Sequence, residues 1–118
     1  MKIGELSRIS GLTIDTLRYY ESIGLLPLAD RDAGGHRDYD ASILTWIEFL
    51  ARMKTAGMPL KDMLRYARLL QQGPDTVDQR CKMLQEQRER VRGKIESLQS
   101  CMDAIDKKIL NLLQMKQG

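Results

Sequence analysis

The sequence predicts a mainly α-helical fold, in which four short helices and a small hairpin precede one long helix. Apolar residues recur at three- and four-residue spacing over most of the chain, which is the period of an amphipathic helix. Glycines and prolines divide the first two thirds into short segments. The last third instead keeps one unbroken 3.5-residue repeat, which indicates a single supercoiled helix.

Residues 3–26 predict two short helices joined by a tight turn. The apolar positions of the first helix are Ile3, Leu6 and Ile9. Gly11 ends this helix, because the left-handed residue that follows a helix is most easily glycine. Thr13 is the expected N-cap of the second helix, residues 14–23, which ends at Gly24. A helix, a short glycine-containing turn and another helix make a helix-turn-helix, whose second helix normally enters the major groove of DNA.

A hairpin and two more helices follow. The polar segment 29–39 has Gly34 and Gly35 at its centre, which predicts a hairpin with short strands. Asp40 or Ser42 caps the third helix. The apolar positions of the third helix are Ile43, Leu44, Ile47, Leu50, Ala51 and Met53.

Gly57 ends the third helix, and Pro59 begins the fourth at a first-turn position. The apolar positions of the fourth helix are Leu60, Met63, Leu64, Ala67 and Leu69 or Leu70. The sequence Gly73-Pro74-Asp75 then separates it from the last helix.

The long helix is expected over residues 75–115, about 60 Å at 1.5 Å per residue. Its seam alternates by four and three residues through Val77, Cys81, Leu84, Arg88, Val91, Ile95, Leu98, Met102, Ile105, Ile109 and Leu112. Arg88 alone is not apolar. One small head cannot cover so long a stripe, and we therefore predict that a second copy covers it.

Composition excludes more than it identifies. The chain of 118 residues has 42% hydrophobic and 30% charged residues, which fits a soluble protein with a long amphipathic helix. It contains neither a membrane-spanning run of about 20 apolar residues nor a signal-peptide pattern, so we expect a cytoplasmic protein without a membrane partner. The sequence shows no nucleophile–base pair, paired carboxylates, phosphate loop or metal cluster. We expect neither an enzyme nor a cofactor or metal site.

Three segments resemble the MerR (mercury-resistance regulator) family of bacterial transcription factors. They are LTIDTLRYYESIGLL at residues 12–26, GHRDY at 35–39 and AGMPLKDM at 56–63. The resemblance covers roughly residues 1–72 by motif and the remainder by architecture. It implies a winged helix-turn-helix DNA-binding domain over residues 1–72. It also implies a dimerisation helix over residues 75–115, which forms an antiparallel coiled coil between two protomers.

The resemblance also implies which side chains meet DNA. Thr16, Arg18 and Tyr19 would face the groove or its phosphate walls, since Arg can grip guanine while Thr and Tyr hydroxyls suit phosphate or thymine. The alternative for Arg18 is an ion pair with Glu21 or another acid. The DNA-binding residues predicted in full are Thr13, Thr16, Arg18, Tyr19, His36, Arg37, Tyr39 and Lys61. We expect Leu17 to face the core, Tyr20 to pack and Glu21 to tie helices together.

Arg37 and Tyr39 match the arginine-x-tyrosine of the family wing, whose targets are backbone phosphates. Lys61 resembles a phosphate contact at a helix N-terminus. A solvated surface charge is the alternative for Arg37 and Lys61. His36 has no neighbouring cysteine, and a turn or phosphate-contact role is favoured over metal binding. Trp46 is expected to be partly buried between heads or helices.

Active family members distort the spacer between two promoter elements so that RNA polymerase engages both, and the resemblance implies the same here. The chain is similar to the short, aldehyde- and electrophile-responsive subgroup without a C-terminal effector domain. That subgroup often has a reactive cysteine late in the third helix, where this chain has Arg52. A sequence-blind architectural DNA-binding protein and a coiled-coil adaptor are the other classes considered.

Cys81 and Cys101 leave thiol- or metal-responsive variants of this scaffold open. Twenty residues separate them, about 30 Å along one helix, so they cannot share a metal or pair within one chain. Cys81 could form a redox-linked disulfide with Cys101 of another subunit if the dimer axis passes near Val91. Cys101 could instead be alkylated. The reading we favour makes Cys81 a small seam residue and Cys101 incidental.

Overall fold

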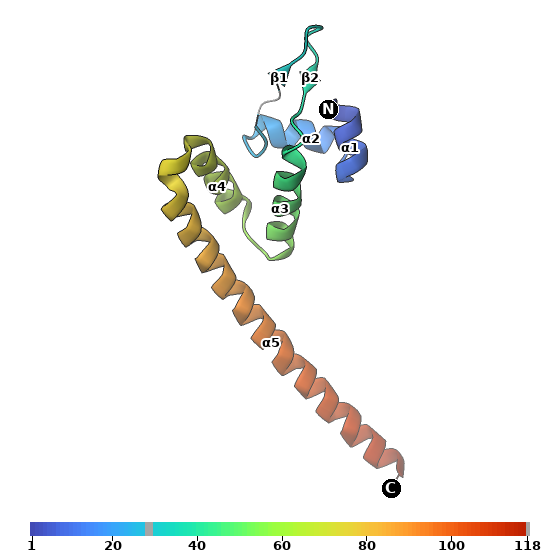
Figure 1. The fold of residues 1–118 in the computed structure, drawn as a ribbon. Coiled ribbons are helices and arrows are strands. Elements are labelled where there is room, and N and C mark those ends of the chain that lie inside the picture. Colours follow the sequence, from blue (N-terminus) through green and yellow to red (C-terminus); the bar gives the residue numbers. More distant parts are fainter. Residues whose placement is uncertain (28–29, 118) are drawn as a thin grey trace. The chain divides into compact units, whose positions relative to one another are not determined.

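The computed structural model describes residues 1–27 and 30–117, so Ala29, where the predicted hairpin segment begins, lies outside the described residues. The prediction of a mainly α-helical fold is confirmed (Figure 1). In chain order the elements are α1 (Ile3–Ser10), α2 (Ile14–Ser22), β1 (Asp30–Arg31), β2 (Arg37–Asp38), α3 (Ile43–Thr55), α4 (Leu60–Gln72), the 3₁₀-helix η1 (Pro74–Thr76) and α5 (Val77–Gln117).

The chain divides into two compact units, of which the first is Met1–Arg80 and the second begins at Cys81. In the first unit α1 packs against α2 and α3, and α3 packs against α4. Strands β1 and β2 pair antiparallel and form the wing (Figure 1). Leu6, Leu17 and Leu26 are the fully buried side chains at the centre of the apolar core. The core of this unit is therefore built in part from α1, α2 and the segment that follows α2.

The turn between α1 and α2 follows the predicted local chemistry. Gly11 has φ +78°, and its N–H donates to the carbonyl of Ser7 at 3.0 Å. Thr13 is the N-cap of α2, because its Oγ1 accepts a hydrogen bond from the N–H of Thr16 at 3.1 Å. Helix α2 ends at Ser22, one residue earlier than expected, and Gly24 follows with φ +86°.

Two predicted helix starts are wrong by one or two residues. Pro59 lies just before α4 in an extended conformation, and not in the first turn. Asp75 belongs to η1, so the long helix begins at Val77. The cause is a 3₁₀ turn fixed by Thr76, which is buried and donates its hydroxyl to the carbonyl of Leu69 at 2.6 Å. Because this hydrogen bond joins Thr76 to a residue of α4, a local sequence pattern does not predict the 3₁₀ turn.

At the start of α3, the two predicted capping residues have different roles. Ser42 occupies the N-cap position, but its side chain makes no capping hydrogen bond. The side chain of Asp40 accepts from the N–H of Ser42 at 3.1 Å instead. Trp46, in the second turn, is partly buried as predicted, and its Nε1 donates to the carbonyl of Leu25 at 2.8 Å. This bond ties α3 to the segment that follows α2.

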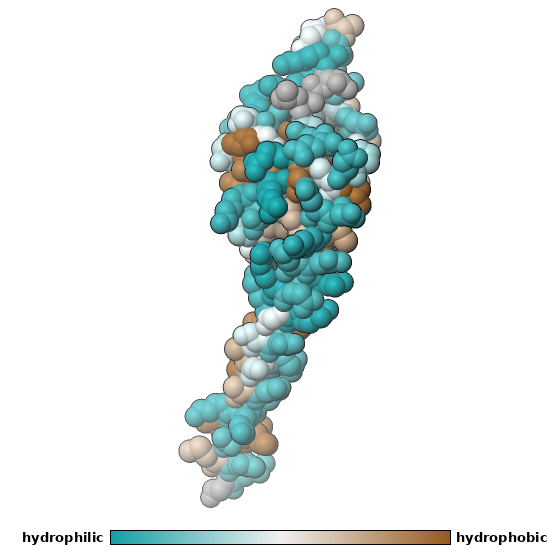
Figure 2. Space-filling view, turned by 90° about the vertical axis from the view of Figure 1, so that its left-hand side faces the viewer, coloured by the Kyte–Doolittle hydropathy of each residue, from teal (hydrophilic) through white to brown (hydrophobic). Residues whose placement is uncertain are grey.

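Helix α5 has 41 residues and exposes much of its apolar stripe. On the face shown in Figure 2, apolar side chains along this helix lie exposed among hydrophilic ones. The seam residues with at least half of their surface exposed include Val77, Ile95, Leu98, Met102, Ile105, Ile109 and Leu112. Among the described residues, none of the helices is long and apolar enough to cross a membrane.

Candidate nucleic-acid interface

Helix α2 has one buried face and one open face. Leu17 is fully buried as predicted, and Tyr20 packs against the core. Arg18 and Tyr19 lie on the exposed side, with 54% of the tyrosine surface open to solvent. Within the described part of the chain, Arg18 forms no ion pair with Glu21. The open face therefore offers a guanidinium and a phenol, which are both suited to DNA.

The two threonines at the start of α2 are linked to each other. Thr13 Oγ1 donates to Thr16 Oγ1 at 2.9 Å, in addition to capping the helix. Thr13 is exposed and Thr16 is half-buried. Each hydroxyl keeps lone-pair or donor capacity for a partner in solvent. Thr13 caps the helix and Thr16 supplies the N–H that is capped, whereas DNA contact by either residue stays a prediction.

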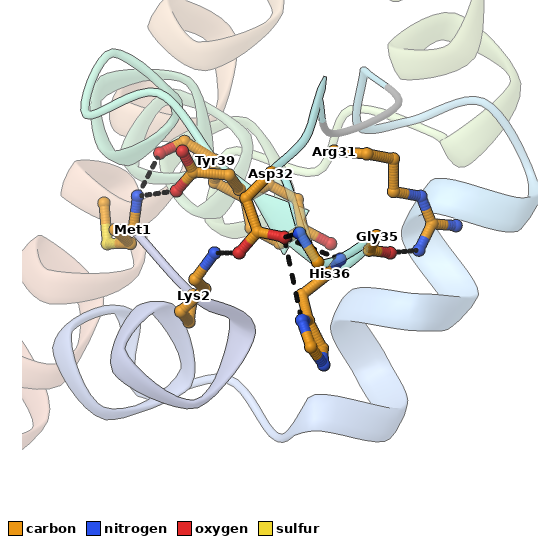
Figure 3. Close-up of polar contacts among 9 residues, drawn as sticks. Met1, Lys2, Arg31, Asp32, Gly35, His36 and Tyr39 are labelled. Carbon is orange, nitrogen blue, oxygen red and sulfur yellow. Dashed lines mark hydrogen bonds and ion pairs between the residues drawn. The ribbon is translucent and has the colours of Figure 1, made fainter.

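Asp32 organises the tip of the wing (Figure 3). Its Oδ1 accepts from the N–H groups of Gly34 and His36, both at 2.9 Å, and its Oδ2 accepts from Nζ of Lys2. The hydrogen bond from Lys2, followed by the one from His36, lowers the pKa of Asp32 to about 2. Arg31 Nη1 donates to the carbonyl of Gly35 at 3.0 Å. The wing tip is thus ordered by its own polar groups together with Lys2.

The base of the wing is fastened to α2 through Glu21. The carboxylate accepts from Arg37 Nε at 3.1 Å and from the Tyr39 hydroxyl at 2.6 Å. Only 8% of the Glu21 side chain is exposed. We expected Glu21 to tie helices together, but it joins a helix to the wing. Sequence reasoning missed this junction because the three residues meet only after the chain has folded.

Tyr39 is placed differently from a surface phosphate contact. It is 3% exposed, and its hydroxyl is engaged by Glu21. Burial, and then the hydrogen bond to Glu21, raises the pKa of Tyr39 to about 12. The neutral phenol is therefore the stable form. In this structure Tyr39 is a core residue that holds the wing in place.

The start of the chain also holds β2. The Met1 ammonium donates to Asp38 Oδ1 at 2.7 Å and to the carbonyl of Tyr39 at 2.6 Å (Figure 3). The N–H of Tyr39 donates in return to the carbonyl of Met1 at 2.7 Å. The same ammonium, by hydrogen bonding and then by charge, lowers the pKa of Asp38. These contacts give the wing a second attachment, to the start of the chain just before α1.

The other predicted DNA contacts lie on the surface. Lys61 is exposed in the first turn of α4, and His36 is exposed near the wing tip. His36 Nδ1 lies 3.6 Å from Asp32 Oδ1. Arg37 keeps a third of its side chain exposed while its Nε binds Glu21. The structure therefore brings Arg37, Tyr39 and α2 together directly, whereas Lys61 stands on a separate helix.

The thiols give no sign of a shared site. Cys81 and Cys101 are both free and exposed. Within residues 1–27 and 30–117, no group of three or more His, Cys, Asp or Glu side chains is arranged to hold a metal ion. The disulfide between subunits and the alkylation of Cys101 stay predictions.

Comparison with known proteins identifies the family. Residues 2–39 match the family described as MerR family regulatory protein, and residues 44–108 match the family described as MerR, DNA binding. The transcriptional regulator AdhR of Bacillus subtilis is 40% identical over 91 residues, which are 77% of this chain and 65% of AdhR. The match thus spans just under two thirds of that relative.

Solved structures agree with the sequence matches. A MerR family transcriptional regulator from Listeria monocytogenes has a TM-score of 0.84 and 37% identity, over 92% of this chain and 83% of that one. HiNmlR, described as a MerR family regulator lacking the sensor domain and bound to promoter DNA, has a TM-score of 0.81 and 31% identity. That alignment covers 92% of this chain and 86% of HiNmlR. These relatives are transcriptional regulators and not enzymes. The chain belongs to the MerR family of transcriptional regulators.

Proposed function

We propose that this regulator acts as a homodimer at a near-palindromic promoter site. The observation that carries the proposal is the pairing of an open α2 face, with Arg18 and Tyr19 exposed, and a wing fastened to the same helix through Glu21. A helix and a wing held at fixed relative positions can contact a groove and the adjacent phosphates at once. HiNmlR, the similar regulator solved on promoter DNA, supports this assignment.

The DNA-contact residues follow from their exposure. Arg18 and Tyr19 contact bases or groove walls. Thr16, whose hydroxyl proton is not used within the helix cap, contacts phosphate or thymine, and Thr13, whose proton is donated to Thr16, contacts thymine. His36, Arg37 and Lys61 neutralise backbone phosphates, which contributes salt-dependent affinity. Tyr39 acts indirectly, because its hydroxyl donates to Glu21, the same carboxylate that holds Arg37.

The exposed seam of α5 supports the dimer. A stripe of large apolar side chains, each at least half exposed in the single chain, calls for a partner surface. An antiparallel pair of α5 helices would cover it and hold two heads at a fixed separation. In this proposal residues 1–72 bind DNA and residues 75–115 dimerise.

Activation follows from DNA deformation. Two heads fixed by a shared coiled coil can bend and untwist the spacer between promoter elements that they do not contact, so that RNA polymerase engages both. A signal would act by favouring one of two dimer conformations. Because its target is promoter DNA, we place the protein in the cytoplasm.

Footprinting combined with sedimentation tests the proposal. We expect a dimer in solution and protection of one dyad-symmetric site upstream of a neighbouring gene. Arg18→Ala should weaken binding to that site by about 1–3 kcal/mol, or roughly 5- to 150-fold, while the helical circular dichroism stays unchanged. Arg68→Ala, on the exposed surface of α4, is the matched control and should leave affinity near that of the wild type.

Two results would contradict the proposal. A monomer at micromolar concentration would remove the two-headed arrangement. Protection spread evenly over any duplex, with Arg18→Ala and Arg68→Ala behaving alike, would instead indicate a sequence-blind architectural protein.

A further inference from the structure

Asp32, at the tip of the wing, uses its two carboxylate oxygens for different contacts (Figure 3). Its Oδ1 accepts from the N–H groups of Gly34 and His36, both at 2.9 Å, and these hydrogen bonds close the turn. Its Oδ2 accepts from Nζ of Lys2, which lies 30 residues earlier in the chain. The first contacts are local, whereas the second joins the wing tip to the residue just before α1.

Lys2 is held on both sides by backbone hydrogen bonds. Its carbonyl accepts from the N–H of Leu6 at 3.0 Å, and the carbonyl of Met1 accepts from the N–H of Tyr39 at 2.7 Å. The Lys2 side chain is 52% exposed, but it starts from a fixed stretch of backbone. Because less backbone freedom remains to be lost, this lysine can hold the wing tip near the start of α1.

The imidazole of His36 lies close to the same turn. Its Nδ1 is 3.6 Å from Asp32 Oδ1, and a Cβ added at Gly34 would lie only 3.1 Å from that nitrogen. The His36 side chain is nevertheless 77% exposed. An exposed imidazole thus has a defined place, which depends on Asp32 and on the absence of a side chain at residue 34.

The charge of Asp32 gives the contact with Lys2 a consequence for DNA binding. The hydrogen bond from Lys2 is the largest cause of the low pKa of Asp32, about 2, so the carboxylate is ionised at neutral pH. The proposed function brings the wing against backbone phosphates, and an ionised acid at its tip would repel them. Lys2 supplies the opposite charge beside it.

We propose that Lys2 and Asp32 form a positioning pair for the wing, in which Lys2 strengthens DNA binding through Asp32 and not through a phosphate contact of its own. The inference rests on the contact between the wing and DNA proposed above. Lys2 fixes the wing tip relative to α1 and offsets the charge of Asp32, so that His36 meets the phosphates in a set orientation. Both members of the pair lie outside the three segments that carry the family resemblance.

Asp32→Asn separates this role from a direct contact by the sign of its effect. Asparagine forms the same kind of turn through its side-chain oxygen, so the turn is kept while the charge that binds Lys2 is lost. The positioning pair predicts that promoter affinity falls by about two- to fivefold, as expected for an exposed ion pair, although a negative charge has been removed. A Lys2 that contacts phosphate itself predicts tighter binding, because Asp32→Asn would release its ammonium.

A double-mutant cycle on promoter affinity completes the test. Lys2→Gln should weaken binding as Asp32→Asn does, and the two changes together should cost no more than either alone. Lys2→Arg should bind like the wild type, because a guanidinium can contact the same carboxylate. Glu5→Gln is the matched control, since Glu5 and Arg8 form an exposed pair within α1, and its affinity should not fall. A tighter Asp32→Asn variant, or losses that add in the double variant, would overturn the proposal.

His36 reports on the wing tip without DNA, since it is the only histidine of the chain. Its imidazole C–H signals in proton NMR should shift in Lys2→Gln, return in Lys2→Arg and stay unchanged in Glu5→Gln. Unchanged signals in Lys2→Gln would overturn the link between Lys2 and the wing tip. A wild-type chain that shows this link but does not bind the promoter duplex contradicts the proposed function, and the role of the pair in DNA binding with it.

Discussion

At the scale of single residues, Glu21 connects the recognition helix to the wing. Its carboxylate, with 8% of the side chain exposed, accepts from Arg37 and from Tyr39. Hydrogen bonds to a charged group contribute more than neutral ones, and a buried carboxylate has few alternative partners. Because Glu21 holds Arg37, which we propose contacts DNA, we expect a change at Glu21 to affect both folding and DNA binding.

We expect Glu21→Gln to lower the free energy of unfolding by about 1–3 kcal/mol and to weaken promoter binding. The amide keeps the shape of the side chain, but it loses the charge and one of the two acceptors. Urea denaturation and a gel-shift titration measure the two effects. Glu48→Gln is the matched control, because Glu48 and Arg52 form an exposed pair on α3 that contributes about 0.5 kcal/mol or less. Equal stability of the two variants would contradict the role given to Glu21.

Tyr39 gives the junction a pH dependence at the alkaline end. Its pKa is raised from the ordinary 10.0 to about 12 by burial and then by Glu21, so folding favours the protonated phenol. The resulting stabilisation is complete below about pH 10 and is lost as the pH rises towards 12. The difference in unfolding free energy between wild type and Tyr39→Phe should therefore shrink over this interval. If the difference in unfolding free energy stayed constant from about pH 9 to about pH 12, Tyr39 would not be a buried neutral phenol.

At the scale of elements, the sequence predicts the features that depend on contacts within a few residues. It does not predict those that depend on contacts between residues farther apart in the chain. Gly11 and Thr13 fix the turn before α2 through contacts within a few residues, and the sequence predicted both. The 3₁₀ turn at Thr76 depends on the carbonyl of Leu69, and the start of α5 was accordingly misplaced. The wing was predicted from paired glycines, whereas Asp32, which organises its tip, was missed. An Asp two residues before Gly34 is a recognisable turn signal that could have found it.

The N-cap of α2 is open to a direct test. Thr13→Ala removes the hydroxyl that accepts from the N–H of Thr16, and should destabilise the head by about 1 kcal/mol. For a head of this size the melting temperature should fall by roughly 4–8 °C. Thr13→Asp should restore it, because a carboxylate also caps a helix. Thr45→Ala, at an exposed position within α3, is the control and should not lower the melting temperature. Similar melting of the two alanine variants would refute the capping role.

At the scale of the whole molecule, the seam was predictable because its period is a property of sequence alone. The second copy that we propose covers the seam is a property of two chains, and a single chain shows only the exposed stripe. The same holds for the DNA-binding surface. The family motif includes Arg18, Arg37 and Tyr39, but only the folded head shows that Tyr39 is buried and shares the Glu21 carboxylate with Arg37. A sequence motif does not distinguish residues that contact DNA from residues that act by holding another residue in place.

Arg88 offers the sharpest test of the seam, because it is the one seam position that is not apolar. A polar residue at such a position specifies register and lowers dimer stability. Arg88→Leu would bury an additional apolar side chain in each protomer and should tighten the dimer, with Kd falling by roughly tenfold or more in sedimentation equilibrium. Arg92→Leu is the matched control, since both arginines contact Glu89, at 3.9 Å for Arg88 and 3.2 Å for Arg92, but only Arg88 lies in the seam. Tightening by Arg92→Leu and not by Arg88→Leu would mean that a different face of α5 is buried in the dimer.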